Sequence, residues 1–235
     1  MAALRQVAPT TIMETGPVYG ARLAIAAASA LLFAVVAYDV VTNGVLSERD
    51  VQVVAWLGVH GSAALDTLMT WASLSGGPAI TSAYASILIV AYLARRRIAA
   101  AVAIGTIVYG AAVFNIAVKH LVQRGRPALE GPLMALPTYS FPSGHAAAST
   151  VFGGLICLLA WRSGFRGRRA GVAIACAVAW VALVAVSRVY LGLHYPTDVV
   201  AGTAEGLLWL MVWTIAFDRL GIDLRWPAGH SKLSR

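Results

Sequence analysis

Residues 99–118 read AAAVAIGTIVYGAAVFNIAV, twenty residues in a row without a charged side chain. A helix needs about 20 predominantly apolar residues to cross the hydrocarbon core of a bilayer. The next residue is Lys119, so a charge follows at the point where a spanning helix would leave the hydrocarbon. This stretch predicts a transmembrane helix, and the rest of the chain can be placed relative to it.

Further apolar runs of similar character occur at Ala21–Val41, His145–Trp161, Ala170–Val186 and Val199–Phe217. A shorter run, Pro78–Leu93, lies between Gly-Gly-Pro and three arginines. We therefore predict an all-α fold, a bundle of six transmembrane helices formed by a single domain over residues 1–235. The first run is longer than the core of a signal peptide, about 7–15 residues, so we expect a retained anchor helix.

The composition supports this class. Of 235 residues, 59% are hydrophobic and 12% are charged, and the mean hydropathy is +0.75. A soluble domain carries about 25% charged residues, so there are too few charges here to cover a water-facing surface. Cys157 and Cys176 lie inside apolar runs and are expected to be packing residues. A soluble globular domain, a disordered chain and a disulfide scaffold are all excluded.

The stretch 48–75 mixes charged residues with Val, Leu and Trp, which favours an interfacial amphipathic segment over a span. With six spans, thirteen of the eighteen Lys and Arg residues fall on the side that holds both termini. By the positive-inside rule that side is cytoplasmic, and loops 42–77, 119–144 and 187–198 face outward. The outward cations are Arg49, Lys119, Arg124, Arg126 and Arg188. They either snorkel to lipid headgroups or form an anion site.

One outward segment reads Pro142-Ser143-Gly144-His145 directly before an apolar run. Ser143 is a good N-cap residue, and the free N–H groups of a helix start bind phosphate-like anions. Gly144 has no side chain to hinder a ligand near that backbone. His145 adds a titratable group in the first turn.

A second outward segment runs from Ser187 to Asp198. His194 and Asp198 are four residues apart, so the carboxylate can fix the tautomer of the imidazole and leave its other nitrogen free as a nucleophile or base. Asp198 can equally be a carboxylate that stabilises a helix start after Pro196. The remaining histidines, His60, His120 and His230, have no comparable neighbours and are read as incidental.

Arginine forks and a lysine match the oxygens of a phosphoryl group, and Lys119, Arg126 and Arg188 can neutralise its charge. The three segments resemble the signature of the type 2 phosphatidic acid phosphatase (PAP2) superfamily, K-x6-R-P, P-S-G-H and S-R-x5-H-x3-D. All three motifs are complete and in order between Lys119 and Asp198.

The resemblance implies that His194 is a nucleophile that forms a phosphohistidine and that Asp198 orients it. It implies that His145 protonates the leaving oxygen and later helps to activate water. The groups expected to hold the phosphate are Lys119, Arg126, Ser143, Gly144 and Arg188. Neither a metal nor another cofactor is implied. On the residues alone, the motif loops offer Glu130 and Asp198 as carboxylates, too few for a two-metal site.

The implied function is a lipid phosphate or diphosphate phosphatase in the plasma or inner membrane, acting at the outer or periplasmic face. Its partners are the lipid phosphate substrate and the surrounding membrane lipids. Several substrates stay open: phosphatidic acid, phosphatidylglycerol phosphate, polyprenyl diphosphates such as undecaprenyl diphosphate, phosphorylated prenyl sugars and lipid A phosphates. Residues 139–141 and the segment 48–75 are expected to shape the substrate entrance.

A phosphotransferase using the same residues is the alternative function. The haloperoxidases of the same superfamily are soluble proteins, so the apolar spans argue against that chemistry. A transporter is disfavoured because the ionisable residues lie at helix ends rather than at the bilayer midplane. Asp39 and Glu205 are expected to make helix-end or interhelical hydrogen bonds. No nucleic-acid recognition motif is present, so nucleic-acid binding is rejected.

Overall fold

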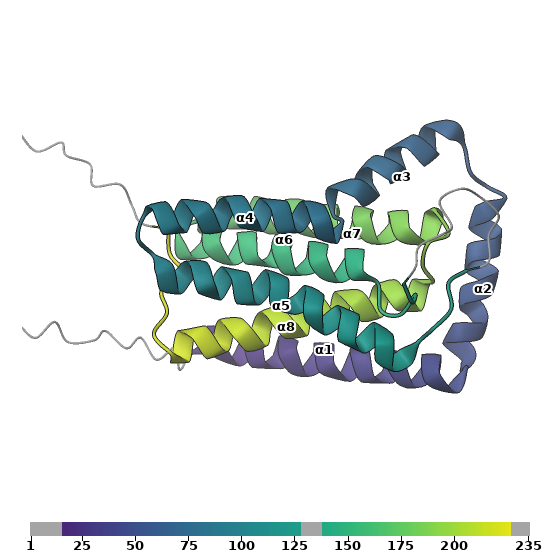
Figure 1. Ribbon diagram of the computed structural model, residues 1–235, viewed down its shortest axis with the longest axis horizontal. Coiled ribbons are helices and arrows are strands. Elements are labelled where there is room, and N and C mark those ends of the chain that lie inside the picture. Colours follow the sequence, from purple (N-terminus) through teal and green to yellow (C-terminus); the bar gives the residue numbers. More distant parts are fainter. Residues whose placement is uncertain (1–15, 128–137, 227–235) are drawn as a thin grey trace, which may run out of the picture.

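The computed structural model of the protein describes residues 16–127 and 138–226. In these two stretches the regular secondary structure is entirely helical (Figure 1), which confirms the expected all-α class for the described residues. The helices are α1 (Pro17–Thr42), α2 (Val45–Gly58), α3 (Ala63–Ser75), α4 (Pro78–Ala94), α5 (Ile98–Val122), α6 (Gly144–Arg162), α7 (Gly167–Tyr190) and α8 (Pro196–Arg219).

Five helices, α1, α5, α6, α7 and α8, are long and apolar enough to cross a bilayer. They coincide with five of the predicted spans, and their ends differ from the prediction by four residues or fewer. The helix α4 coincides with the short sixth run but has only 17 residues. It is long enough only when joined to α3, from which it is bent by 43°. The described chain therefore holds five candidate spans, or six if α3 and α4 form one bent span.

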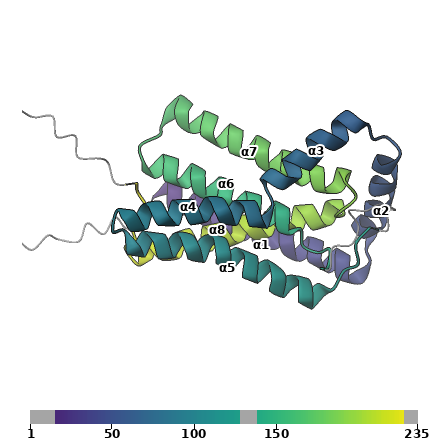
Figure 2. The ribbon, with the colours of Figure 1, turned by 45° about the horizontal axis from the view of Figure 1, so that its top comes forward.

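The segment expected to lie in the interface forms two helices, α2 and α3. The helix α2 runs across the end of the bundle, whereas α3 leans against the end of α7 and leads directly into α4 (Figures 1 and 2). The break between α2 and α3 has a local cause. Ser62 is the N-cap of α3, and its Oγ accepts a hydrogen bond from Leu65 N (3.4 Å). The interfacial location of the segment stays a prediction; α2 lies across the bundle end, and α3 forms with α4 a bent pair that is long enough to span.

Two glycines of α8 allow its start to lie close against the start of α6. A Cβ atom at Gly206 would lie 2.8 Å from Ala147 O, and one at Gly202 would overlap the carbonyl oxygen of Ser143. Larger side chains here would push the two helices apart. This close packing matters because each helix start carries one of the sequence motifs.

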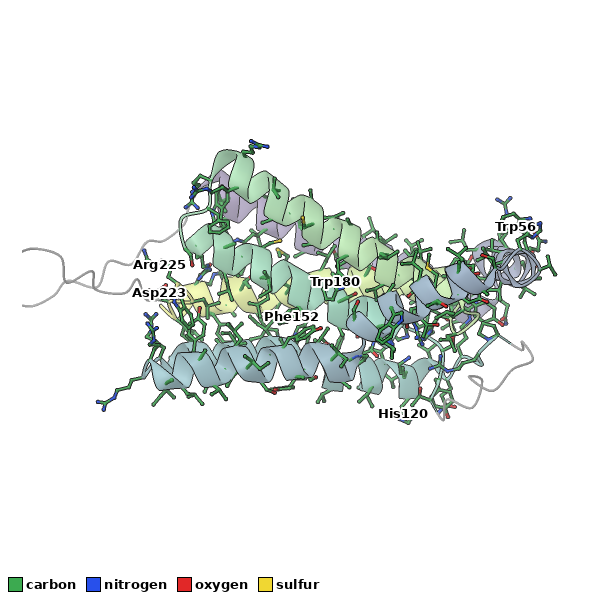
Figure 3. The ribbon with its side chains drawn as sticks, turned by 90° about the horizontal axis from the view of Figure 1, so that it is seen from above. Trp56, His120, Phe152, Trp180, Asp223 and Arg225 are labelled. Atoms are coloured by element: carbon green, nitrogen blue, oxygen red, sulfur yellow. The ribbon has the colours of Figure 1, made fainter. Side chains whose placement is uncertain are left out.

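The two ends of the bundle differ in character. At one end lie the start of α1, the end of α8 and the basic loops, and there Asp218 of α8 pairs with Arg22 of α1 and Arg162 of α6. Asp223 and Arg225 are also at this end in Figure 3, which places Trp56 and His120 at the opposite end. We call the two ends the basic end and the site end. The motifs meet at the site end.

Candidate active site

At the site end the second and third motif segments are joined through their backbones. Ser143 N, just before α6, donates to Asp198 O of α8 (2.8 Å). The turn between α7 and α8 is closed by Arg188 O, which accepts from Leu193 N (3.0 Å) and His194 N (3.2 Å). These bonds place the end of α7 and the starts of α6 and α8 around one point.

His194 and Asp198 face each other across that point, with His194 Nδ1 3.4 Å from Asp198 Oδ2. Asp198 is fully buried, and its Oδ2 also accepts from Tyr195 N (2.9 Å), which closes the first turn of α8. A carboxylate beside Nδ1 favours the tautomer with the proton on that nitrogen and leaves Nε2 unprotonated. Asp198 thus lies both at the helix start and beside the imidazole, the two positions that the sequence left open.

The imidazole of His194 is uncharged at neutral pH. Its residue is 1% exposed, and this burial lowers its pKa to about 4 although Asp198 acts in the opposite direction. A neutral imidazole keeps a lone pair on Nε2. Arg126 Nη1 lies 3.3 Å from that nitrogen, so a cation stands beside the candidate nucleophile.

Two residues that the sequence analysis missed hold the Asp198 carboxylate. Ser140 Oγ donates to Asp198 Oδ2 and lies 3.4 Å from His194 Nδ1. Arg124 Nη1 donates to Asp198 Oδ1 (2.7 Å). Ser140 lies outside the motifs, and Arg124 occupies a position that the first motif leaves open. The sequence placed Arg124 among the outward cations, but its pattern did not indicate that Asp198 is its partner.

A cavity of about 240 Å³ lies beside the His194 imidazole. Six of the eight predicted site residues line it: Lys119, Arg126, Gly144, His145, Arg188 and His194. The remaining lining is mostly small or apolar and comes largely from α4, α5 and α6, including Pro78, Ala111, Ile116, Ala148 and Val151. The other two predicted residues, Ser143 and Asp198, are fully buried behind the wall. The cavity therefore joins a charged wall to an apolar one.

Arg188 presents an unsatisfied donor in this region. The residue is 4% exposed, and its Nη1 donates to Ser73 Oγ of α3 (2.6 Å). Its Nε is buried and has no hydrogen-bond partner among the described residues. A buried guanidinium with an open donor is costly unless an anion completes it, so this arginine is suited to a phosphate oxygen.

Lys119 has a second task that the sequence did not suggest. Its ammonium group donates to three carbonyl oxygens in the segment before α6, those of Tyr139 (2.8 Å), Ser140 (3.3 Å) and Pro142 (2.6 Å). These bonds fix the segment before α6, which carries Ser140 and the N-cap residue of α6. Lys119 therefore helps to shape the cavity and also places a positive charge at its wall.

The start of α6 has the features expected of an anion site. Ser143 is its N-cap, with Oγ accepting from Ala146 N at 3.5 Å. The first N–H groups of any helix lack intrahelical acceptors, and those of Gly144 and His145 start this one at the cavity wall. A Cβ at Gly77, in the turn between α3 and α4, would lie 3.0 Å from His145 Nε2, so this imidazole is packed against that turn.

The polar residues outside the motifs behave as expected where they are described. Asp39 accepts from Leu46 N (3.1 Å) and Ser47 N (2.8 Å) at the start of α2, which confirms a helix-end role. Glu205 Oε2 accepts from Asn115 Nδ2 (2.7 Å), which confirms an interhelical hydrogen bond.

The incidental histidines that the structure describes make ring contacts with aromatic side chains. His60 stacks on Trp56 of α2, and His120 meets the Tyr139 ring edge-on, each away from the His194–Asp198 pair. His230 and Glu130 lie outside the described residues. Within residues 16–127 and 138–226, no group of three or more His, Cys, Asp or Glu side chains is arranged to hold a metal ion.

The chain is similar to known proteins both in sequence and in structure. The sequence profile of the PAP2 superfamily matches residues 100–222 of the chain. In structure, the chain is similar to a crystal structure of a transmembrane PAP2 type phosphatidylglycerolphosphate phosphatase from Bacillus subtilis. The TM-score is 0.73 and the identity 24%, over 83% of this chain and 96% of that one. At this identity the likeness shows the fold alone.

Curated relatives are similar over shorter segments. The chain is 35% identical over 97 residues to phosphatidylglycerophosphatase B of Bacillus subtilis, covering 41% of this chain and 47% of the relative. It is 38% identical over 95 residues to a lipid A 1-phosphatase of Rhizobium johnstonii, covering 37% and 34%. It is 35% identical over 96 residues to a decaprenylphosphoryl-5-phosphoribose phosphatase of Mycobacterium tuberculosis, covering 39% and 46%. Each alignment spans less than half the length of the relative.

Proposed function

The chain belongs to the PAP2 superfamily, and on this premise we propose that it is a membrane-embedded phosphatase that hydrolyses a phosphomonoester or terminal phosphate of a lipid. One observation carries the proposal. The neutral His194, backed by Asp198, shares a single cavity wall with His145 and with the cations Lys119, Arg126 and Arg188. A nucleophile, an acid and a cluster of cations are the groups that phosphoryl transfer through a covalent intermediate needs.

In the first step, His194 Nε2 forms a bond to phosphorus while the bond from phosphorus to the lipid oxygen breaks. His145 gives its proton to that leaving oxygen. The imidazole of His194 becomes positively charged as it takes the phosphoryl group, and Asp198, beside Nδ1, stabilises this charge. In the second step a water attacks phosphorus, its proton passes to His145, and the bond from phosphorus to Nε2 breaks.

The cations supply the electrostatic part of the mechanism. The charge on the phosphoryl oxygens is balanced by Arg126, next to His194 Nε2, and by the open Nε donor of Arg188. Lys119 adds a third positive charge, and the start of α6 adds the N–H groups of Gly144 and His145, with Ser143 as cap. Such preorganised donors stabilise the transition state without reorganisation and require no metal ion.

We place the active site at the outer face of the cell membrane, with six spans counted by joining α3 and α4, and both termini on the cytoplasmic side. The basic loops lie at the end of the bundle opposite the motifs, and the positive-inside rule assigns that end to the cytoplasm. At the site end α2 carries Trp56, which is 59% exposed, as suits a helix at the lipid interface.

The substrate class follows from the cavity and from the relatives. The charged wall suits a phosphate group and the apolar wall from α4, α5 and α6 suits the adjoining lipid. The names of the relatives describe phosphatases for a glycerophospholipid, for lipid A and for a prenyl-linked sugar. A lipid-bound phosphate is common to them, and hydrolysis is favoured over transfer to an acceptor because each is named as a phosphatase.

The test is phosphate release by the purified protein in detergent with EDTA present. The panel holds phosphatidic acid, phosphatidylglycerol phosphate, a polyprenyl diphosphate and a water-soluble phosphomonoester. We expect release from at least one lipid and much less from the soluble ester, with no loss in EDTA. Activity that disappears in EDTA and returns with a divalent metal overturns the metal-independent mechanism. Loss of the lipid phosphate only when an acceptor alcohol is added, with the phosphorylated alcohol as product and no free phosphate, identifies a phosphotransferase instead.

A further inference from the structure

Asp50 is a buried carboxylate on a helix that is otherwise largely exposed. The helix α2 runs across the site end (Figure 1). Its buried residues are Asp50 and Val54, which are four apart and therefore on one face of the helix. Asp50 is 2% exposed. A carboxylate at such a depth is costly unless it is paired and hydrogen-bonded, so the partners of Asp50 define its role.

Both oxygens of Asp50 bind residues of the active-site region. Oδ1 accepts from Thr197 N (3.1 Å), so the carboxylate of α2 caps the first turn of α8. Oδ2 accepts from Arg124 Nη2 (2.9 Å) and from Thr197 Oγ1. A negative charge at this helix start is favoured by the helix dipole, and Asp198 of the catalytic pair lies in the same turn.

Arg124 extends the link to Asp198. Its Nη1 donates to Asp198 Oδ1 (2.7 Å) while its Nη2 donates to Asp50, so one planar guanidinium joins the two carboxylates. The Tyr195 ring also holds the guanidinium of Arg124, whose Cζ lies over the ring at 4.3 Å from its centroid. In a rigid fork, fixing one nitrogen fixes the place of the other.

We propose that Asp50 is a positioning residue for the reaction of the proposed phosphatase, on which this inference rests. It holds Arg124, and through Arg124 it sets the rotation of the Asp198 carboxylate against His194 Nδ1. The helix at the membrane surface thereby helps to fix the geometry of the nucleophile. The 3.4 Å separation of Nδ1 from Asp198 Oδ2 is at the long limit for a hydrogen bond, so small rotations of the carboxylate matter.

Steady-state kinetics of the full-length protein in detergent test this assignment. The Asp50→Asn variant keeps the size of the side chain but removes the charge that holds Arg124 Nη2. We expect kcat to fall about 10- to 100-fold with KM changed less than about threefold, because the phosphate-binding groups stay in place while the catalytic pair is misaligned.

Two matched variants control for charge and for stability. Glu48→Gln makes the same chemical change on an exposed residue of the same helix and should leave kcat within twofold of wild type. Asp218→Asn removes a carboxylate that binds two arginines at the basic end, so it reports the cost of breaking an ion-pair cluster away from the site. Its kcat per folded molecule should also stay within twofold.

A double variant tests whether Asp50 acts through Arg124. Asp50→Asn combined with Arg124→Gln should be no slower than Arg124→Gln alone; losses that multiply would show that Asp50 acts elsewhere and would overturn the proposal. Should Asp50→Asn fail to fold, Arg124→Lys tests the same link, since a lysine keeps the charge but cannot bridge both carboxylates. The proposal then predicts the same loss of kcat at constant KM.

The outcomes separate this inference from the proposed function. Wild-type kcat in Asp50→Asn, together with an inactive His194→Ala variant, contradicts the positioning role and leaves the phosphatase proposal intact. Activity that survives His194→Ala contradicts the proposed function itself. A loss of kcat in Asp50→Asn that Asp218→Asn matches, per folded molecule, assigns Asp50 a structural role only and overturns the inference.

Discussion

The two ends of the bundle contain clusters built from the same residue types in opposite proportion. At the site end one arginine, Arg124, lies between two aspartates, Asp50 and Asp198. At the basic end one aspartate, Asp218, lies between two arginines, Arg22 and Arg162. The Asp198 side chain is 0% exposed, whereas the Asp218 side chain is 24% exposed.

The two clusters differ in burial and in what lies beside the carboxylate. The Asp218 cluster joins α1, α6 and α8 and has water to share its charge. In the Asp198 cluster both carboxylates are buried, and that of Asp198 faces an imidazole whose second nitrogen has a cation beside it. Burial and a titratable neighbour, rather than the ion pair itself, make the site end the candidate for chemistry. The predictions below use Asp218→Asn as the reference for a change without catalytic consequence.

The largest difference between the ends should come from His194→Ala. Loss of the nucleophile removes the covalent route, so we expect phosphate release to fall by at least about 10⁴-fold. Asp218→Asn should stay within twofold per folded molecule. Initial rates with the best lipid of the panel measure both, and a His194→Ala rate within tenfold of wild type refutes the nucleophile assignment.

His145→Ala should have the next largest effect, about 10²- to 10⁴-fold on kcat, because the leaving oxygen then departs without a proton. The loss should depend on the leaving group. With an aryl phosphate, whose phenolate leaves without protonation, the variant should recover most of the wild-type rate. An equal loss with lipid and aryl substrates means that His145 does not act as the acid.

Asp198→Asn should lower kcat by about 10²-fold with little change in KM. The amide no longer stabilises the charge that His194 gains on phosphorylation, whereas the phosphate-binding cations are untouched. Full saturation curves for wild type and variant check this. A large rise in KM at constant kcat contradicts the orienting role of Asp198.

The smallest predicted effect is on the pH dependence. His194 has a pKa of about 4 and is proposed to act in its neutral form, so on the acid side kcat/KM should stay level down to about pH 5 and fall as the pH drops through 4. Asp198 raises this pKa, so in Asp198→Asn the fall should move to lower pH. A fall that stays in place in the variant belongs to another group, such as the substrate phosphate.

Much of the fold could be predicted because a bilayer imposes a simple rule on sequence. Runs such as residues 99–118 must be apolar over the thickness of the membrane, and their ends are marked by Lys119 and similar charges. The rule is weakest for short helices. The division of residues 48–75 into α2 and α3 depends on the cap at Ser62, and the joining of α3 to α4 depends on a bend that hydropathy does not encode.

The arrangement of the candidate site was predictable where its residues lie close together in the sequence. His194 and Asp198 are four apart, and Ser143 caps the helix it precedes. The supporting residues were missed because their partners are distant in sequence. Asp50 meets Thr197 across 147 positions, and only the folded chain shows that the face of α2 with Asp50 and Val54 packs against the start of α8.

The most direct test of the account is to trap the phosphorylated enzyme. The protein is mixed with a lipid substrate labelled in its terminal phosphate, quenched within milliseconds in alkali, and digested for mass spectrometry. The account predicts an alkali-stable, acid-labile phosphoryl group on His194 in wild type and in Asp218→Asn, and none in His194→Ala. A phosphoryl group on another residue, or turnover with no labelled protein at any time, would contradict the proposal that the reaction passes through His194.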